Sequence, residues 1–486
     1  MSELTDAIAA HARTSPDAPA LVWHDEVTTY GELFAGAEAH RAELAALHLP
    51  PADPVGIVAA KSPEAVALIL GCLLADRPFL LPSPALPDEV LTRLLGQAGC
   101  RHVLGSARPA GTPDTTDAFT VPVGTTFMLT TSGSTGLPKV VPLERGAIDR
   151  FVAWAGEAFD LRPGSTVLNF APLSFDLCLL DVWSTLAHGG RVVLVDPDRA
   201  TNGAHLLELV VRYDVDVIQA VPMFYRLVHD AARDERPLST MVTHALFTGD
   251  AMPQQLLGEL PAMFPKARLY NVYGCTETND SFVCEVREPA DGASIGLPLP
   301  GVSALVIDDN GLPLTGVGTG ELLVSTPFQT AGYLDRQRFA DRFTAHPTGA
   351  DNRRYFRTGD LVRREADGRV HLVGRRDHQV KIRGVAINTA EVEHVLLRHP
   401  SVIEAAVIAE PDPVAGRRLV AHVRRAAAGD GAAPVNSLTL REHCARRLPR
   451  AAVPSVLRIV DAPLPRTSTG KVDRIALTNS GKATAA

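Results

Sequence analysis

Residues 127–141 contain the feature that most constrains this chain, a loop of small and hydroxyl residues between two apolar runs. The loop is TSGSTGLPK over Thr131–Lys139, and Val140 and Val141 begin the second run. Glycines let backbone N–H groups approach a polyanion closely, and serine and threonine hydroxyls add donors. Lys139 adds a positive charge. The composition predicts a phosphate-binding loop, with a hairpin turn that binds nothing as the alternative.

This loop is not of the Walker A type. That motif places four residues between its glycines and ends in Gly-Lys-Ser/Thr at the start of a helix. Here Lys139 follows a proline and precedes two valines, which favour a strand.

The rest of the chain predicts an α/β fold with more than one structural unit. At 486 residues it is too long for one ordinary core, and 46% of its residues are hydrophobic. Strand-like and helix-like segments alternate through residues 18–233, which predicts a large domain of layered α/β sheets. Within it, Thr28 and Thr29 are candidate caps of a helix. Short β segments between Gly292 and Thr330 predict a small barrel or antiparallel subdomain.

The C-terminal segment predicts a small α+β domain over residues 377–486, after a large N-terminal domain over residues 1–376. The charged joint around Arg375, Arg376 and Asp377 suits a hinge near Asp377, with a solvated charge run as the alternative. The expected helices and strands of the small domain are Val380–Ile382, Glu391–His399, Val402–Ala409, Arg418–Arg424 and Leu438–Leu448.

Charge and cysteine usage exclude several classes of protein. The net charge is −8, from 47 basic and 55 acidic residues, and no basic block stands out, so we expect no nucleic-acid partner. The six cysteines are scattered without a Cys-x-x-Cys pair, which suits a reducing cytoplasm. The N-terminus lacks a signal-peptide core, and the longest apolar stretch, Ala65–Ala75, is too short to span a bilayer. We therefore expect a cytoplasmic protein without a membrane partner.

Three further motifs carry groups suited to a nucleotide. In YNVYGCTET, Asn271 can bind an adenine edge, the Tyr273 ring can stack on it, and Glu277 can hold Mg²⁺. In YFRTGDL, Asp360 can accept hydrogen bonds from two ribose hydroxyls. In PRTSTGKVDR, Lys471 lies on a loop able to enter a cleft. Alone, each motif would indicate a strand-to-loop junction, a turn aspartate or a solvated lysine.

Together, and in this order, the motifs resemble those of the adenylate-forming superfamily. That superfamily includes acyl-CoA synthetases, luciferases and the adenylation domains of peptide synthetases. The resemblance covers nearly the whole chain and implies two steps. A carboxylate and ATP form an acyl-AMP and pyrophosphate, and a thiol then accepts the acyl group. It also implies that the small, mobile C-terminal domain rotates between the steps, which moves Lys471 out of the site.

The resemblance also implies the site residues and the cofactors, ATP and Mg²⁺. The catalytic residues are Lys471, Glu277 and Thr276, with Glu277 as the metal ligand. Cys275 stands where proline is usual in the family. The expected ATP-binding residues are Thr131, Ser132, Gly133, Ser134, Thr135, Gly136, Lys139, Thr248, Gly249, Asp250, Asn271, Val272, Tyr273, Gly274, Cys275, Thr276, Asp360, Arg375 and Lys471. The chain departs from the family pattern after the hinge, at Ala386, Asn388, Thr389 and Ala390, which leaves open how this surface meets the thiol acceptor.

Asp176 indicates the branch of the superfamily. It follows Phe175 and precedes an apolar helix predicted from Leu177 to His188. A carboxylate on an apolar wall is costly unless a cation meets it, and a substrate α-ammonium would supply that cation. The alternative is an aspartate that caps the helix. The stretch resembles the Phe-Asp-x-Ser motif of amino-acid-activating domains, including D-alanine–carrier protein ligases, with Cys178 in place of Ser.

By the same resemblance, ten positions line the amino acid pocket. Among them Asp280 and Ser281 are polar and Thr248 is small, which predicts a modest-sized amino acid with a hydroxyl or second amine near Asp280. Alternatively, Asp280 faces solvent. The ten residues are Asp176, Leu177, Leu180, Ala220, Leu246, Thr248, Val272, Asp280, Ser281 and Lys471.

The sequence therefore predicts an ATP-dependent amino acid–carrier protein ligase of nonribosomal peptide and secondary metabolite biosynthesis. We expect a free-standing monomer that loads the phosphopantetheine of a separate carrier protein. One alternative is an acyl- or aryl-CoA ligase, against which Asp176 argues. Another is a degenerate nucleotide-binding regulator, against which Lys471, Glu277 and Asp360 argue. The sequence leaves open the amino acid, its chirality, the carrier, the pathway, the oligomeric state and whether CoA can replace the carrier.

Overall fold

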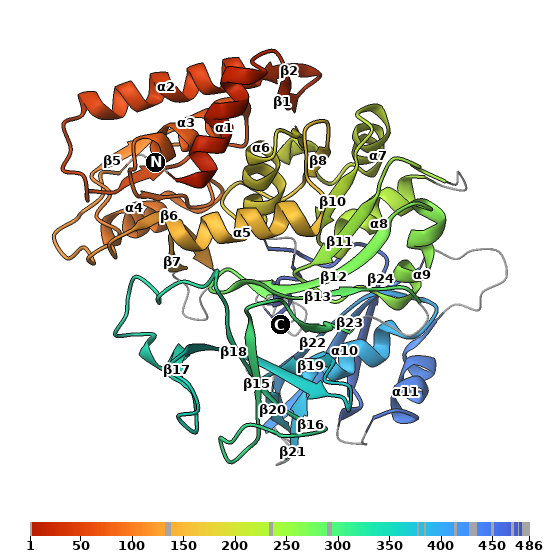
Figure 1. The fold of residues 1–486 in the computed structure, drawn as a ribbon. Helices are drawn as coiled ribbons and strands as arrows, with labels where there is room; N and C mark the ends of the chain where they lie inside the picture. The colour runs from red at the N-terminus through yellow and green to blue at the C-terminus, as the bar shows by residue number, and fades with distance from the viewer. Residues whose placement is uncertain are drawn as a thin grey trace.

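The computed structural model describes most of the chain. It contains a large α/β domain with two sheets of parallel core strands and a third, antiparallel sheet, followed by a small α+β domain (Figure 1). Within the described residues, no helix is both long and apolar enough to cross a membrane. The predicted loop residues 132–136 and the hinge residue Asp377 lie outside them. The described ranges are 2–109, 111–131, 138–232, 237–288, 294–376, 379–382, 385–412, 416–426, 435–448, 452–467, 471–474 and 476–478.

The largest sheet has the strand order β14-β13-β12-β11-β10-β8-β9-β1-β2. Its inner strands, from β1 to β12, pair in parallel, so the carboxyl ends of β10, β11 and β12 meet at one edge. In open α/β sheets that edge is the usual ligand site. The strands are β1 (Pro19–Trp23), β2 (Glu26–Thr29), β8 (Thr166–Asn169), β9 (Arg191–Leu194), β10 (Val217–Ala220), β11 (His244–Thr248), β12 (Arg268–Cys275), β13 (Asn279–Glu285) and β14 (Leu297–Pro298).

A second sheet holds both ends of the predicted phosphate loop. Its strand order is β5-β3-β4-β6-β7, and β6 and β7 pair antiparallel with Thr131 opposite Lys139. The predicted strands on either side of the loop are confirmed, and their pairing brings the first and last residues of the loop together. The strands are β3 (Val55–Ile57), β4 (Phe79–Leu80), β5 (His102–Leu104), β6 (Thr125–Thr131) and β7 (Lys139–Glu144).

Helices cover these two sheets and share a hydrophobic core with them. The predicted threonine cap of α2 is confirmed at Thr29. Its side chain accepts from the Glu32 N–H, and the Thr29 N–H donates to the Glu32 carboxylate at 2.8 Å. The helices are α1 (Glu3–Thr14), α2 (Tyr30–Ala46), α3 (Pro63–Leu74), α4 (Asp88–Gln97), α5 (Arg145–Ala158), α7 (Gly203–Arg212), α8 (Pro222–Ala231) and α9 (Gln254–Met263), with 3₁₀ turns at Pro197–Arg199 and Ala340–Arg342.

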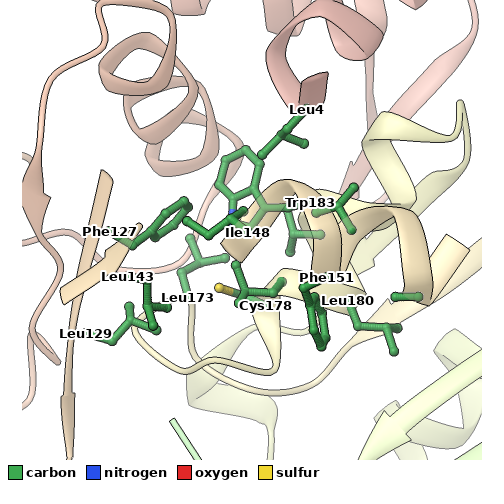
Figure 2. Close-up of a cluster of buried hydrophobic side chains, with 14 of the residues drawn as sticks. Leu4, Phe127, Leu129, Leu143, Ile148, Phe151, Leu173, Cys178, Leu180 and Trp183 are labelled. Atoms are coloured by element: carbon green, nitrogen blue, oxygen red, sulfur yellow. The ribbon is translucent and has the colours of Figure 1, made fainter. Parts of the chain in front are cut away.

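The helix predicted from Leu177 to His188 is wrong in form. Leu179–Ser184 is a π-helix, η1, and only Thr185–Ala187 is α-helical, as α6. All six residues of η1 are buried, and Trp183 packs against Phe127 of β6, with ring centroids 5.9 Å apart (Figure 2). π-helical turns are rare and often lie at functional sites. This one directly follows the loop that carries Asp176.

The predicted small antiparallel sheet is confirmed. The path β15-β16-β18-β17, with β19 paired to β18, forms a curved sheet beside the large one. In the β18–β19 register, Asp360 lies opposite Arg375, which joins two predicted ATP-binding residues. The strands are β15 (Ser303–Ile307), β16 (Gly318–Ser325), β17 (Phe343–Ala345), β18 (Arg354–Arg364) and β19 (Val370–Arg375).

The predicted elements of the small domain are confirmed to within a few residues, and they share a hydrophobic core of their own. Asn388, one of the departures from the family pattern, caps α10: its Oδ1 accepts from the Ala390 N–H at 3.0 Å. Its side chain also packs on Gly374 of β19. A Cβ added at Gly374 would lie only 2.0 Å from Asn388 Nδ2, so this contact requires glycine. The elements are β20 (Gln379–Ile382), β21 (Val385–Asn388), α10 (Thr389–Leu397), β22 (Val402–Asp412), β23 (Gly416–Arg425), α11 (Ser437–Ala445) and β24 (Val456–Val460).

Candidate active site

Lys139 lies among the groups that would surround a polyphosphate. Its Nζ is 5.1 Å from the ring centroid of Tyr333 and 4.9 Å from that of Phe339. Burial lowers the pKa of Lys139, the Glu277 charge opposes that shift, and the Arg342 and Arg375 charges reinforce it. The two arginines both flank Gly359, next to Asp360. The three cations therefore share one region, in which the Glu277 and Asp341 charges also act on Lys139, and such a group of cations suits a polyanion.

Glu277 is held in the turn between β12 and β13. The Tyr333 hydroxyl donates to its Oε1 at 2.5 Å, and burial, then the Glu277 charge, raises the pKa of Tyr333. The Glu277 carbonyl accepts from the Thr330 N–H at 3.0 Å, while the Thr330 hydroxyl donates to Pro142 of β7. One connecting segment thus ties Glu277 to the strand that follows the phosphate loop.

The carboxylate of Asp360 has a donor on each oxygen. The Tyr273 hydroxyl donates to Oδ2, and Arg375 Nη1 donates to Oδ1 at 2.9 Å. The Asp360 N–H donates to the Thr358 hydroxyl at 3.0 Å, which fixes the backbone. Burial, reinforced by the Asp360 charge, raises the pKa of Tyr273, so the phenol stays a donor. Because each carboxylate oxygen can accept two hydrogen bonds, ribose hydroxyls can add to this arrangement.

The remaining predicted adenine contacts lie at the ends of neighbouring strands. Thr248 ends β11 and pairs in register with Val272 of β12, and both are buried. The Asn271 amide donates to the Ser294 carbonyl at 2.9 Å, so part of its polar capacity is already engaged. Asp250 is exposed and accepts from the Ala251 N–H at 2.8 Å. The contacts of these residues with adenine stay a prediction.

Asp176 lies where the motifs converge. Burial raises the pKa of its carboxyl, the Thr276 hydroxyl bonded to it opposes that shift, the Glu277 charge adds to it, and the Lys471 charge opposes it. The helical turn that follows is flanked by Cys178 and has no side-chain cap, so Asp176 is not the cap of η1. Its carboxylate instead bonds to Thr276 and lies within range of the Glu277 and Lys471 charges.

Lys471 reaches this point from the small domain. Its carbonyl accepts from the Thr467 N–H at 2.8 Å, and a β-bridge between Arg466 and Val472 closes the loop. The Lys471 side chain is exposed, and its charge still acts on Asp176. The two domains are therefore placed with the predicted catalytic lysine at the site.

Asp280 is half-buried, so its place in the pocket and the alternative that it faces solvent both stay predictions. Its Oδ2 is buried and, among the described residues, has no hydrogen-bond partner. Burial and the Asp176 charge raise the pKa of Asp280 to about 8. By contrast, the Ser281 hydroxyl donates to the Thr278 hydroxyl and the Asn279 carbonyl, both at 3.2 Å. Other predicted pocket residues, namely Leu180, Ala220, Leu246, Thr248 and Val272, are buried.

Sequence reasoning missed a buried polar cluster behind the pocket. Lys61 Nζ donates to the Asn169 and Phe170 carbonyls at 3.1 and 3.0 Å, and Asn169 Nδ2 donates to Asp181 Oδ2 at 3.1 Å. Burial lowers the pKa of Lys61 to about 7 against the opposing Asp181 charge. Burial raises that of Asp181, and the Asp280 charge adds to the shift. In the sequence, Lys61 and Asp181 are single charged residues in apolar segments, and nothing there indicates that they interact.

Sequence reasoning also missed Glu321, which binds two arginines, one of them next to the predicted hinge. Glu321 of β16 is buried and accepts from Arg357 and, at 2.8 Å, from Arg376 Nη1. Arg376 directly precedes the predicted hinge residue. The acid therefore fixes the end of the large domain.

Comparison with known proteins agrees with this geometry. The model of the AMP-binding enzyme family matches residues 8–126 and 120–334, and that of the AMP-binding enzyme C-terminal domain matches residues 391–471. The chain belongs to the AMP-binding enzyme family of adenylate-forming ligases.

Two relatives show how this chain compares in length. It is 33% identical over 504 residues to the L-proline--[L-prolyl-carrier protein] ligase of Streptomyces coelicolor, which covers 94% of this chain and 92% of that one. It is 30% identical over 506 residues to the dimodular nonribosomal peptide synthase of Bacillus subtilis, which covers 96% of this chain. The match spans only 21% of that synthase.

Among solved structures, ATP-bound MatB from Rhodopseudomonas palustris superposes with a TM-score of 0.83. The match covers 100% of both chains at 23% identity. It supports the fold, including the small C-terminal domain.

Proposed function

We propose that this protein activates an amino acid with ATP, forming an aminoacyl-AMP and pyrophosphate. It then transfers the aminoacyl group to the phosphopantetheine thiol of a separate carrier protein. The observation that carries this proposal is Asp176, a carboxylate that bonds to Thr276 and lies within range of the Glu277 and Lys471 charges where the adenylation motifs meet. The substrate carboxylate must react there, so a carboxylate at that point suits an α-ammonium on the same substrate.

The nucleotide half of the reaction follows from the other contacts. Asp360 would accept the ribose hydroxyls, and Lys139, Arg342 and Arg375 would bind the phosphates. Lys471 would approach the substrate carboxylate and the α-phosphate, where negative charge grows in the transition state. An ammonium that touches both anions lowers the barrier because it binds the transition state more tightly than the ground state.

Glu277 fits as a ligand for Mg²⁺. Its carboxylate is oriented by Tyr333 and lies beside Lys139, next to the end of the phosphate loop. Mg²⁺ usually takes one or two carboxylates together with substrate phosphates and water. When bound, it would neutralise charge on the phosphate oxygens.

The second step, transfer to a carrier protein, is proposed from the comparison with a relative. The Streptomyces coelicolor relative, similar over nearly its whole length, is named for a ligase that acts on a carrier protein. We infer a similar acceptor for this chain. An acyl- or aryl-CoA ligase is the second candidate, favoured by the shared fold alone, and it offers no partner for Asp176.

An Asp176→Asn variant tests the proposal in amino-acid-dependent ATP–pyrophosphate exchange. Breaking a buried charge pair costs about 3–5 kcal/mol, so kcat/KM for the amino acid should fall roughly several-hundred-fold or more. The KM for ATP should barely change, and carboxylic acids without the amine should be relatively better substrates than before.

Asp160→Asn, the same change in a salt-bridged aspartate on the surface, is the matched control and should behave like the unmutated enzyme. An Asp176→Asn enzyme with unaltered amino acid kcat/KM would favour the CoA ligase instead.

A further inference from the structure

Asp280 has no role in the reaction described so far, although its position in the fold is tightly built. It is the second residue of β13, directly after Asn279, whose backbone has a left-handed φ of 52°. Across the turn it pairs with Gly274 at a β-bulge, where a Cβ would lie 2.4 Å from the Asn279 carbonyl oxygen. The Asn279 amide donates to the Phe328 carbonyl at 3.3 Å. This turn fixes the backbone of Asp280 within range of the Asp176 charge.

We propose that the pocket selects an amino acid with a second, side-chain ammonium, and that Asp280 binds that ammonium while Asp176 binds the α-ammonium. The inference rests on the proposed function, since it assumes that Asp176 faces the amino acid. It goes further by naming the substrate class, diamino acids.

The charges around Asp280 carry the argument. Asp280 interacts electrostatically with two other carboxylates: the charge of Asp176, from the loop before η1, acts on it, and its own charge acts on Asp181 of η1. The Lys61 charge acts on Asp181, whose Oδ2 also accepts from Asn169, although Asp181 Oδ1 is buried without a described partner. The substrate α-ammonium would compensate Asp176. Asp280 differs from Asp181 and Asp176, because the charge that shifts its pKa belongs to another carboxylate, Asp176, and not to a cation.

A hydroxyl on the substrate gives a weaker interaction. It can hydrogen-bond to the protonated carboxyl of Asp280, but it brings no positive charge with which an ionised Asp280 could pair. An apolar side chain would leave Oδ2 without any partner, as in the free pocket. The neighbouring pocket residues Leu246 and Val272 belong to the hydrophobic core and carry no cation. A second ammonium satisfies both the charge and the hydrogen bond.

The burial of Asp280 also suits a ligand that arrives as a cation. Because burial and Asp176 raise the pKa of Asp280 to about 8, its carboxyl is largely protonated in the free pocket at neutral pH. It can lose its proton when an ammonium binds beside it. The free protein thereby avoids an uncompensated charge on a carboxyl with a buried oxygen until the substrate supplies its partner.

The test is ATP–pyrophosphate exchange with matched pairs of amino acids, in both chiral forms. Each pair exchanges an ammonium for a methyl group of similar size: 2,3-diaminopropionate with 2-aminobutyrate, 2,4-diaminobutyrate with norvaline, and ornithine with norleucine. At least one diamino acid should exceed its methyl partner by about a hundredfold or more in kcat/KM, since the pairing resembles other buried charge pairs. Serine and homoserine serve as the hydroxyl probes.

Asp280→Asn should reduce that ratio to within a few-fold of one, mainly through loss of activity on the diamino acid. Glu285→Gln is the matched control, because Glu285 lies on the same strand but pairs with Arg268 outside the pocket. It should keep the ratio. Thermal unfolding checks that Asp280→Asn folds, and its Tm should equal or exceed that of the unmutated protein, because an unpartnered buried carboxyl is removed.

The outcomes separate the two proposals. If no amino acid supports exchange, the proposed function itself is wrong. If methyl-bearing or hydroxyl-bearing amino acids are preferred over every diamino acid, or if a folded Asp280→Asn keeps the diamino acid preference, this inference is wrong and the proposed function stands.

Discussion

Asp360 and Asp280 are two carboxylates of the predicted site, one buried and one half-buried, and their surroundings differ. Asp360 has a tyrosine donor on one oxygen and an arginine donor on the other. Asp280 has an oxygen without a described partner and another carboxylate as its charged neighbour. Consecutive residues of β12 serve both, since Tyr273 bonds to Asp360 and Gly274 lies opposite Asp280.

The comparison distinguishes a carboxylate whose hydrogen bonds the protein itself provides from one whose partner must come from a ligand. If Asp360 binds the ribose, as we propose, the nucleotide adds contacts to a carboxylate whose oxygens both already have donors. If Asp280 lines the amino acid pocket, the substrate supplies a partner that the protein does not. A buried acid is costly without a cation, and the protein keeps that cost only where binding removes it.

The largest expected effect comes from Lys471→Ala. Adenylation should fall by orders of magnitude while ATP binding survives, because the ammonium acts mainly on transition-state charge. Exchange kinetics together with equilibrium ATP binding measure this split. Exchange within about tenfold of the unmutated enzyme, only about 1.4 kcal/mol, would remove Lys471 from the catalytic residues.

Lys61→Met tests whether the acids behind the pocket depend on their buried cation. It leaves Asp181 without its compensating charge, and breaking a buried pair costs about 3–5 kcal/mol. Denaturant unfolding should show this loss of stability. The double variant Lys61→Met, Asp181→Leu should recover most of it, whereas equal instability of both variants would contradict the pairing.

Asp360 and Asp280 should respond oppositely to the same conservative change. In Asp360→Asn, an amide NH₂ replaces one of the two carboxylate oxygens that accept from Tyr273 and Arg375. The lost hydrogen bond should cost about 1–3 kcal/mol of stability. Asp280→Asn should cost nothing or stabilise. Equal destabilisation in denaturant unfolding would break the comparison.

Activity should respond to Asp360 in a separate way. Asp360→Ala should raise the KM for ATP more than it lowers kcat, because ribose contacts bind ground and transition states alike. Steady-state exchange kinetics at varied ATP concentrations provide the measurement. A pure kcat defect would contradict the assignment of Asp360 to the ribose.

A pH dependence of stability is a further expected effect. The pKa of Asp280 is raised in the folded protein to about 8, so between about pH 4 and 8 the folded state holds a proton that the unfolded state releases. Its contribution to stability therefore falls as pH rises through that window, by about 1 kcal/mol per pH unit or less. Asp176, Asp181, Lys61 and Lys471 also act on this region. Parallel curves for Asp280→Asn and the unmutated protein would contradict the assignment.

The sequence predicted those site residues whose charge, within a motif, already indicates a chemical role. Asp176, Glu277 and Lys471 stood out from their surroundings, and the structure brings them together. The sequence could not predict which side chains would hydrogen-bond to the site residues. Tyr273 and Asp360 are separated by 87 residues, so only the folded sheets bring them into contact.

Other features left no local pattern at all. The buried pair of Lys61 and Asp181 comes from two apolar segments far apart in the chain, and Tyr333 comes from a connecting segment. The π-helix at Leu179–Ser184 was predicted as an α-helix because a short, fully buried run has no polar face to reveal its period. The phosphate loop over residues 132–136 and the hinge at Asp377 stay predictions.

The most direct test of the central claim is ATP–pyrophosphate exchange by the unmutated enzyme with α-amino acids and with the same acids lacking the α-amine. If Asp176 binds a substrate ammonium, exchange should require an amino acid, and each des-amino partner should be at least about a hundredfold poorer in kcat/KM. Exchange that proceeds equally well with the des-amino acids would contradict the account.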